Sequence, residues 1–320
     1  MTSTVTVDIA GAWMGGAARY AAELEGYLAR TGRQDVRIIG KAQHVAPAWL
    51  VRRELAKPHA ARRVAVNNVS FVIPGGPRWA VLRNALHFLT DAEADRLGPE
   101  LRTSVRREAA VVRLAARRAD VLVVPCTAMA ERVRRAMPSV RNRLVVRAHP
   151  VSAPVVRSPR DQAILCPVLF APYKQMDRWL SELLAAVGDS GDSEVRVRVT
   201  ASPGELPPAL ASEPRIEFLG RIGHQELREV WGRSRAIYFP TGLESFGYPL
   251  AEARVSGQPV IAQNTAQNEE IAGRALCGFR PGDRDSLSHA VKLALTDDVP
   301  ADPAPFDPDS YFEWVLGSAQ

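Results

Sequence analysis

Short continuous runs of apolar residues recur along the chain and predict buried strands, because strands covered on both faces of a parallel sheet show little polar alternation. In the first half, the runs predicted as strands are 5–9, 36–39, 64–66, 71–73, 80–82, 121–124 and 144–146. In the second half, the apolar runs are 163–170, 195–199, 216–222, 236–239 and 259–261. Segments with helical spacing separate many of these runs, an alternation typical of α/β domains.

A proline-rich stretch divides the chain. Three prolines within ten residues interrupt both helix and strand, so residues 149–159 form the predicted linker. We therefore expect an N-terminal domain over 1–155 and a second domain over 156–303. A Pro- and Asp-rich segment then leads into a short helix within the C-terminal tail, 304–320.

The stretch 239–261 places two glutamates around a strand-to-helix turn. A helix is predicted to begin between residues 246 and 249 and to end at Gly257, a residue favoured at helix C-termini. Glu244 precedes this helix and Glu252 lies within it. Two carboxylates would repel a phosphate, but they can accept hydrogen bonds from sugar hydroxyls on either side of a diphosphate.

Two strand-to-helix turns have the composition of anion-binding loops. In the first, N–H groups near Ser245, Phe246 and Gly247 could point at a phosphate at a helix N-terminus. In the second, Gly15 and Gly16 follow the first strand and let the backbone approach a ligand. A tight turn without a ligand explains the two glycines equally well, and the missing G-x-G-x-x-G pattern argues against dinucleotide binding.

The sequence F-G-Y-P-L-A-E at 246–252, preceded by Glu244, resembles the donor-site signature of family 4 retaining glycosyltransferases. The resemblance implies the GT-B fold, in which two Rossmann-like α/β/α domains face each other across a cleft and the tail helix packs back on the N-terminal domain. It implies that Glu244 contacts the transferred sugar, that Glu252 contacts the nucleotide ribose, and that Tyr248 belongs to the donor site. The alternative is an amphipathic helix with solvated glutamates.

The same resemblance assigns further donor-site residues in the second domain. Lys174 falls where the family carries the lysine of an Arg–Lys pair that binds the donor diphosphate. The arginine is absent, since Leu169 and its neighbours are apolar, and Arg178 or Arg221 could replace it. The family uses the stretch that ends in Gly220 and Arg221 to hold the nucleobase. The alternative for Lys174 is a solvated loop lysine.

In the first domain, the resemblance places the loop with Gly15 and Gly16 near the donor phosphates. Family members also carry His or Asn near the transferred sugar, at the end of a strand in the middle of the domain. His87 is our candidate for this catalytic position, and Asn84 competes with it. A structural histidine is the alternative.

The composition indicates the class of protein and its cellular compartment. The 320 residues are 46% hydrophobic and 24% charged, typical of globular proteins, and we find neither an 18-residue apolar run nor a signal peptide. Cys126, Cys166 and Cys277 lack metal-ligand spacing and predict a reducing, cytoplasmic environment. Cys126 stands where the family usually has serine, and we interpret it as a packing residue.

Arginines dominate the net charge of +6, and four of them recur at helical spacing in a helix predicted over 101–119. The four that share this face are Arg102, Arg106, Arg113 and Arg117. A solvated helix face explains them, and contact with an anionic membrane surface or an acidic partner is the alternative. Nucleic acid is excluded as a partner, because no aromatic residues are interleaved for base stacking.

The resemblance implies a metal-independent, retaining glycosyltransferase, and we predict this activity for the chain, in glycoconjugate or secondary-metabolite biosynthesis. The expected substrates are a nucleotide-diphosphate sugar, either UDP- or GDP-linked, and a small-molecule or glycan acceptor. Departure of the diphosphate would be stabilised by Lys174 and backbone N–H groups, with no covalent nucleophile and no further cofactor. A nucleotide-sugar epimerase of the same fold and a non-catalytic sugar-nucleotide-binding protein are the alternatives.

Overall fold

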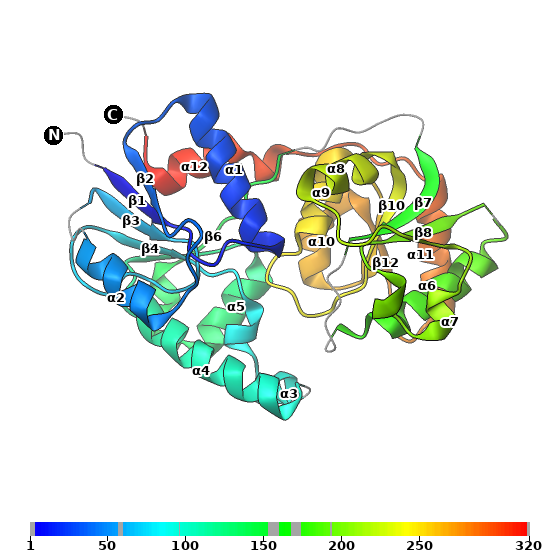
Figure 1. The fold of residues 1–320 in the computed structure, drawn as a ribbon, viewed down its shortest axis with the longest axis horizontal. Coiled ribbons are helices and arrows are strands. Elements are labelled where there is room, and N and C mark those ends of the chain that lie inside the picture. The colour runs from blue at the N-terminus through cyan, green and yellow to red at the C-terminus, as the bar shows by residue number, and fades with distance from the viewer. Residues whose placement is uncertain are drawn as a thin grey trace. The chain divides into compact units, whose positions relative to one another are not determined.

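Two parallel six-stranded sheets with flanking helices form the structure, a computed structural model that describes residues 4–56, 60–95, 97–152, 160–167, 174–192 and 194–318 (Figure 1). The chain divides into two compact units. The first contains Met1–Val151, Leu243–Phe246 and Phe306–Gln320, and the second contains Ser152–Gly242 and Gly247–Pro305. The predicted α/β class is confirmed.

The first unit is built on a sheet with the strand order β2-β1-β3-β4-β5-β6, in which every neighbouring pair is parallel. Its strands are β1 (Val5–Asp8), β2 (Val36–Ile39), β3 (Arg62–Ala65), β4 (Arg78–Val81), β5 (Val121–Val124) and β6 (Leu144–Val146). Val7, Val64 and Val123 are at most 1% exposed. Such burial explains why the sequence shows continuous apolar runs here.

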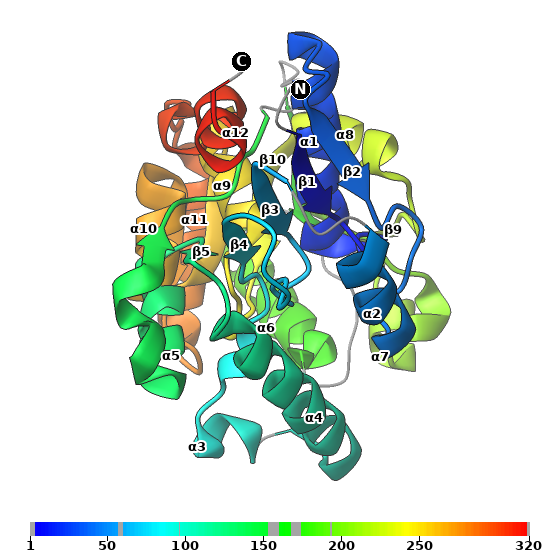
Figure 2. The ribbon, with the colours of Figure 1, turned by 90° about the vertical axis from the view of Figure 1, so that its left-hand side faces the viewer.

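Helices cover both faces of the first sheet. In Figures 1 and 2, α1 and α12 lie on one face, and α2, α4 and α5 on the other. The helices are α1 (Gly15–Thr31), α2 (Pro47–Ala56), η1 (Ala85–Phe88), α3 (Asp91–Ala94), α4 (Pro99–Ala116), α5 (Thr127–Ala136), η2 (Pro138–Arg143) and α12 (Pro308–Leu316). The tail helix α12 packs on α1 through Tyr311 and Phe312, whose rings meet the Tyr20 ring edge-on.

The second unit has the strand order β12-β11-β10-β7-β8-β9, again parallel throughout. Its strands are β7 (Asp161–Cys166), β8 (Arg196–Val199), β9 (Ile216–Phe218), β10 (Ser234–Phe239), β11 (Val260–Gln263) and β12 (Leu276–Phe279). The last of these strands was not predicted. Residues 168–170 of the predicted run 163–170, and 153–159 of the predicted linker, lie outside the described residues.

Helices also cover both faces of the second sheet. In Figure 1, α8, α9 and α10 lie on one face, and α6 and α11 on the other. The helices are α6 (Met176–Asp189), η4 (Pro203–Glu205), α7 (Pro208–Ala211), α8 (His224–Arg233), α9 (Tyr248–Ser256), α10 (Ala266–Ala272), η5 (Gly273–Ala275) and α11 (Arg284–Thr296). A last short turn, η6 (Ala304–Phe306), precedes α12.

The strand predicted at 71–73 is wrong, because side chains of α2 bind the backbone of this segment. Arg53 donates to the carbonyl oxygens of Val69 and Ser70. Glu54 accepts hydrogen bonds from the N–H groups of Val72 and Ile73, at 2.9 and 3.1 Å. The backbone groups that would form a sheet ladder are thus already paired.

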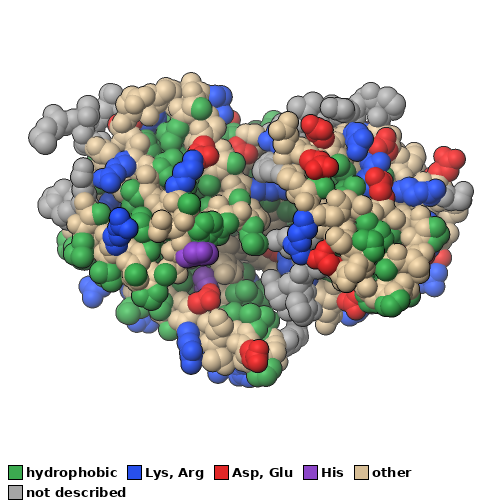
Figure 3. Space-filling model, in the orientation of Figure 1, with side chains coloured by type: hydrophobic (Ala, Val, Ile, Leu, Met, Phe, Trp, Pro, Cys, Tyr) green, Lys and Arg blue, Asp and Glu red, His purple; other side chains and the backbone are tan. Residues whose placement is uncertain are grey.

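Charged side chains of both signs are interspersed over the face shown in Figure 3. The described residues contain no helix with the length and apolar character needed to cross a bilayer. They also contain no cluster of three or more His, Cys, Asp or Glu side chains placed to hold a metal ion.

Candidate functional site

The second sheet reverses the direction of its connections between β7 and β10. The strand β7 is followed by β8 on one side, whereas β10 is followed by β11 on the other. Ligands of open α/β sheets bind beyond the carboxyl ends of the strands at such a switch point. The loops and turns after β7, β8 and β9 carry Lys174, Glu205 and Arg221, and the loop after β10 leads into α9.

Helix α9 carries Glu252 on a buried face. Gly247 precedes the helix with a φ of 82°, and an added Cβ would lie 2.9 Å from the Leu250 Cδ1 atom, so this turn requires glycine. Gly257 ends the helix in the left-handed region, as predicted. Glu252 is only 8% exposed. The alternative of solvated helix glutamates is therefore wrong for Glu252, since a carboxylate this buried requires polar partners.

Lys174 lies close to the carboxyl end of β7. Burial raises the pKa of Cys166, the last residue of this strand, to about 12, and the charge of Lys174 opposes that rise. Lys174 itself is half-buried. The structure therefore places Lys174 near the switch point, and position 169 lies outside the described residues.

Arg221 has a partner of its own. Its Nη2 atom lies 2.5 Å from the Glu205 Oε1 atom, and the arginine side chain is 63% exposed. Hydrogen bonding from the Ser202 backbone, followed by the pairing with Arg221, lowers the pKa of Glu205. The neighbouring Gly220 has a φ of 66°, so this turn favours glycine. Arg178, the other predicted substitute, pairs with Glu182 at 2.7 Å.

In the first unit, an arginine that the sequence analysis missed reaches the predicted glycine loop, whose Gly15 and Gly16 lie in the first turn of α1. Arg83 follows β4, and its Nη1 atom donates to the Gly16 carbonyl oxygen over 3.2 Å. Its guanidinium lies 5.5 Å from the centre of the Tyr20 ring. Helix α1 begins at Gly15 without an acidic residue in its first turn. The helix dipole and Arg83 therefore both favour an anion at this loop.

The loop Leu243–Phe246, with Glu244, belongs to the first unit and contacts the same region. The Ser245 hydroxyl donates to the Arg83 carbonyl oxygen over 2.5 Å, and the Cys126 thiol donates to the Ser245 carbonyl oxygen over 3.3 Å. Phe246 is 2% exposed and packs edge-on against His149. The Ser245 hydroxyl and the Phe246 ring are thus structural contacts, and Cys126 is a buried packing residue, as expected.

His149 is a buried histidine beside Arg83 that the sequence analysis assigned only to the linker. Its ring centre lies 5.5 Å from that of Tyr20 and 5.1 Å from that of Phe246. Burial, and secondarily the charge of Arg83, hold the pKa of His149 well below its usual value. The ring is therefore neutral at physiological pH.

His87 and Asn84 contact each other. Asn84 caps η1 by accepting a hydrogen bond from the Leu86 N–H group, and its Nδ2 atom lies 3.3 Å from the His87 Nε2 atom. His87 is 5% exposed, and its Nε2 atom lies 3.6 Å from a Glu108 oxygen. Burial lowers the pKa of His87. These contacts explain both residues as parts of the packing around η1.

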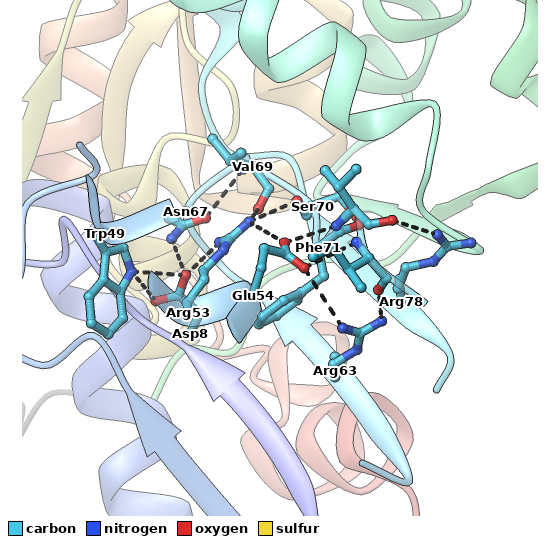
Figure 4. Close-up of polar contacts among 12 residues, drawn as sticks. Asp8, Trp49, Arg53, Glu54, Arg63, Asn67, Val69, Ser70, Phe71 and Arg78 are labelled. Atoms are coloured by element: carbon cyan, nitrogen blue, oxygen red, sulfur yellow. Dashed lines mark hydrogen bonds and ion pairs between the residues drawn. The ribbon is translucent and has the colours of Figure 1, made fainter. Parts of the chain in front are cut away.

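The switch point of the first sheet, between β1 and β3, is filled by an internal network (Figure 4). Asp8 is fully buried at the end of β1 and accepts hydrogen bonds from Ala10 N, Asn67 Nδ2 and Trp49 Nε1. Arg53 of α2 pairs with Asp8 at 2.5 Å. This network joins α2 and the loop after β3 to the end of β1.

Residues 161–297 match the family model described as glycosyl transferases group 1. The O-antigen chain mannosyltransferase B of Escherichia coli is 31% identical over 83 residues, which cover 26% of this chain and 22% of that protein. The chain matches between 19% and 24% of the length of the curated relatives.

Solved structures match over a larger part of the chain. WaaG, a glycosyltransferase involved in lipopolysaccharide biosynthesis, is similar with a TM-score of 0.64 and 17% identity, over 98% of this chain and 96% of that one. A pneumococcal O-GlcNAc transferase, GtfA, in complex with UDP and GlcNAc has a TM-score of 0.54 and 13% identity, over 84% and 57% of the two chains. These similarities confirm the predicted GT-B fold.

Proposed function

We propose that the protein is a glycosyltransferase, because residues 161–297 match the family model described as glycosyl transferases group 1. We propose that it moves a sugar from a nucleotide-diphosphate donor to a small-molecule or glycan acceptor in glycoconjugate biosynthesis, with retention of configuration and without a metal. The observation that carries this proposal is the buried Glu252 on α9, directly after the switch-point strand β10. The presence of UDP in the GtfA complex supports a nucleotide donor.

The proposed roles follow from charge and position. Glu252 accepts hydrogen bonds from the nucleotide ribose, and Glu244 from the transferred sugar. In the reaction, the bond between the sugar and the diphosphate breaks, and its electron pair leaves with the diphosphate oxygen. A hydroxyl oxygen of the acceptor forms the new bond to the same sugar carbon, and its proton passes to the departing diphosphate oxygen. Lys174 and the backbone near Gly247 stabilise the charge that grows on this leaving group.

For the first unit, we propose Arg83 rather than His87 as the polar side chain that assists the reaction. Arg83 contacts the loop of Gly15 and Gly16, which we propose for the donor phosphates, whereas His87 packs against Asn84. Arg83 is also a better candidate than Arg221 to replace the family's missing phosphate-binding arginine, because Arg221 pairs with Glu205. Gly220 and Tyr248 remain proposed contacts of the donor nucleotide.

Calorimetry with UDP, GDP, ADP and TDP tests the donor site directly. One of these nucleotides should bind, and Glu252→Ala should weaken its binding by about 1.5–3 kcal/mol, typical of a hydrogen bond to a charged group. Glu244→Gln should lower the turnover and leave nucleotide binding intact. The exposed Glu229 of α8 provides a matched control, since Glu229→Ala should change neither quantity. The proposal fails if no nucleotide binds to the folded wild-type protein.

The same assays separate the alternatives. An epimerase would turn over a nucleotide sugar without an acceptor, and a non-catalytic binding protein would bind it without any turnover. The three cysteines are buried thiols that are not joined in disulfide bonds, and on this basis we propose a cytoplasmic location.

A further inference from the structure

The outward face of α4 combines exposed arginines with exposed apolar side chains. Arg107, Val111 and Leu114 are spaced four and three residues apart and therefore lie along one face of the helix. Arg118 follows in the turn directly after the helix, and both arginines are exposed. Val111 is 51% exposed and Leu114 is 63% exposed. We call these four residues the α4 face.

The α4 face differs from the arginine face predicted from the sequence. Arg102 is half-buried and pairs with Asp95 at 2.8 Å. Arg113 is also half-buried, and its Nε atom donates to the His87 carbonyl oxygen over 2.8 Å. Two of the four predicted arginines therefore serve contacts within the first unit, and the outward charge lies elsewhere on the helix.

The core does not require the apolar residues of the α4 face. The opposite side of the helix is already buried through Val105, Ala109, Val112 and Ala116, which are at most 7% exposed. Figure 2 shows α4 along the outside of the first unit. Exposed single apolar residues are common, but here two large ones lie next to each other between two arginines along one helix face.

The surroundings of the α4 face are basic. Among the exposed side chains of α4 and its following turn, the charged ones are Arg106, Arg107, Arg117, Arg118, Glu100 and Glu108. Glu108 accepts a hydrogen bond from the Ser104 hydroxyl. Arg143 of η2 donates to the Arg117 and Ala119 carbonyl oxygens, and the exposed Arg141 belongs to the same short helix.

We propose that the α4 face docks the protein on an anionic lipid surface. Arg107 and Arg118 would contact lipid phosphates, while Val111 and Leu114 would enter the boundary between head groups and acyl chains. This division of roles fits a bilayer better than an acidic protein, because a bilayer offers an anionic layer directly above an apolar one. The inference is independent of the proposed transferase activity.

Vesicle sedimentation with the full-length protein tests this inference. The protein should bind vesicles of phosphatidylcholine and phosphatidylglycerol at low salt and bind much less to phosphatidylcholine alone. The double variant Arg107→Ala/Arg118→Ala should weaken the partition coefficient about 30-fold. Leu114→Ala should weaken it about fivefold, and this loss should persist at higher salt, since apolar contacts are not screened as charges are.

A charge-matched control uses two exposed arginines on strands, Arg37 of β2 and Arg196 of β8. The double variant Arg37→Ala/Arg196→Ala removes the same charge and should bind vesicles nearly as well as the wild type. Equal losses in both double variants would overturn the proposal in favour of a general effect of net charge. Absence of wild-type binding to anionic vesicles, or an unchanged Leu114→Ala variant, would also overturn it. An acidic protein partner would then be the occupant to test.

Discussion

The two sheets have switch points of the same kind, yet these are occupied differently. Between β1 and β3 of the first sheet, Asp8 and Arg53 form an ion pair in which both side chains are at most 1% exposed. Beside the switch point of the second sheet, Lys174 is half-buried. Arg221, which pairs with Glu205, has a side chain that is 63% exposed. The first set of charges holds the protein together, whereas the second is accessible from solvent.

This difference shows that topology alone does not identify a binding site. Parallel order predicts where a crevice forms at the carboxyl edge of a sheet. In the first unit, α2 and the loop after β3 fill that position with their own polar side chains (Figure 4). Arg83 and the glycine loop remain as the candidate anion-binding groups of this unit, next to the filled position.

The largest effect that we predict comes from removing the ion pair between Asp8 and Arg53 at the switch point of the first sheet. Arg53→Ala should lower the free energy of unfolding by about 3–5 kcal/mol, because it leaves the Asp8 carboxylate buried without its cation. It also removes the donor to the Val69 and Ser70 carbonyl oxygens. Urea denaturation followed by circular dichroism measures the change.

The neighbouring residue provides the control for this prediction. Arg52 is exposed on the same helix, so Arg52→Ala should change the free energy of unfolding by no more than about 0.5 kcal/mol. The double variant Asp8→Asn/Arg53→Met, which removes both charges, should recover part of the lost stability. Equal stability of Arg53→Ala and the wild type would show that the network is not structural.

The contrast between the two switch points also explains what the sequence could predict. Helix α9 could be predicted because the glycines and the proline that mark its ends, and its glutamate, all lie within a few residues of one another in the sequence. The buried network could not, because Asp8, Trp49, Arg53 and Asn67 are brought together only by the strand order. The erroneous strand at 71–73 has the same cause, since its backbone partners come from α2.

The candidate site residues also differ in how far the sequence could identify them. Lys174 lies between β7 and α6, and it was identified through the family resemblance of the surrounding sequence. Arg83 directly follows the predicted strand 80–82, and that signal could have identified it. Its contact with Gly16 depends on two segments 67 residues apart, which no single stretch of sequence shows.

The next largest effect should come from the accessible charge of the second unit. Lys174→Ala should reduce transition-state stabilisation by about 3–4 kcal/mol, the effect seen when a preorganised donor to a developing charge is lost. Binding of the nucleotide diphosphate should weaken less, because the leaving group carries its largest charge in the transition state. Steady-state kinetics and calorimetry give the two values.

An exposed arginine near Lys174 serves as the control. Arg178 pairs with Glu182, and Arg178→Ala should leave turnover and affinity within about threefold of the wild type. If Lys174→Ala behaves like Arg178→Ala, another cation binds the diphosphate. Arg83→Gln would then be the variant to compare, because Arg83 is the arginine that contacts the glycine loop.

The smallest predicted effect concerns the buried cluster of His149, Tyr20 and Phe246. It tests whether water is excluded from this cluster, as it is from the buried Asp8 network. Burial and the charge of Arg83 hold the pKa of His149 well below its usual value of about 6.5. The unfolded chain therefore binds a proton near pH 6.5 that the folded protein does not bind. The free energy of unfolding should fall as the pH decreases below about 6.5, by up to about 1.4 kcal/mol per pH unit.

His149→Phe separates this contribution from other titrating groups. His87 also has a lowered pKa and adds a slope of the same sign, so the wild type alone is not diagnostic. The informative quantity is the difference in unfolding free energy between wild type and His149→Phe, measured by urea denaturation from pH 7.5 to 5.5. That difference should be constant above the pKa of unfolded histidine, about 6.5. Below this pH, the wild type should lose stability relative to the variant. Parallel curves over the whole range would mean that His149 takes up its proton in the folded state, and the cluster would then be hydrated, unlike the Asp8 network.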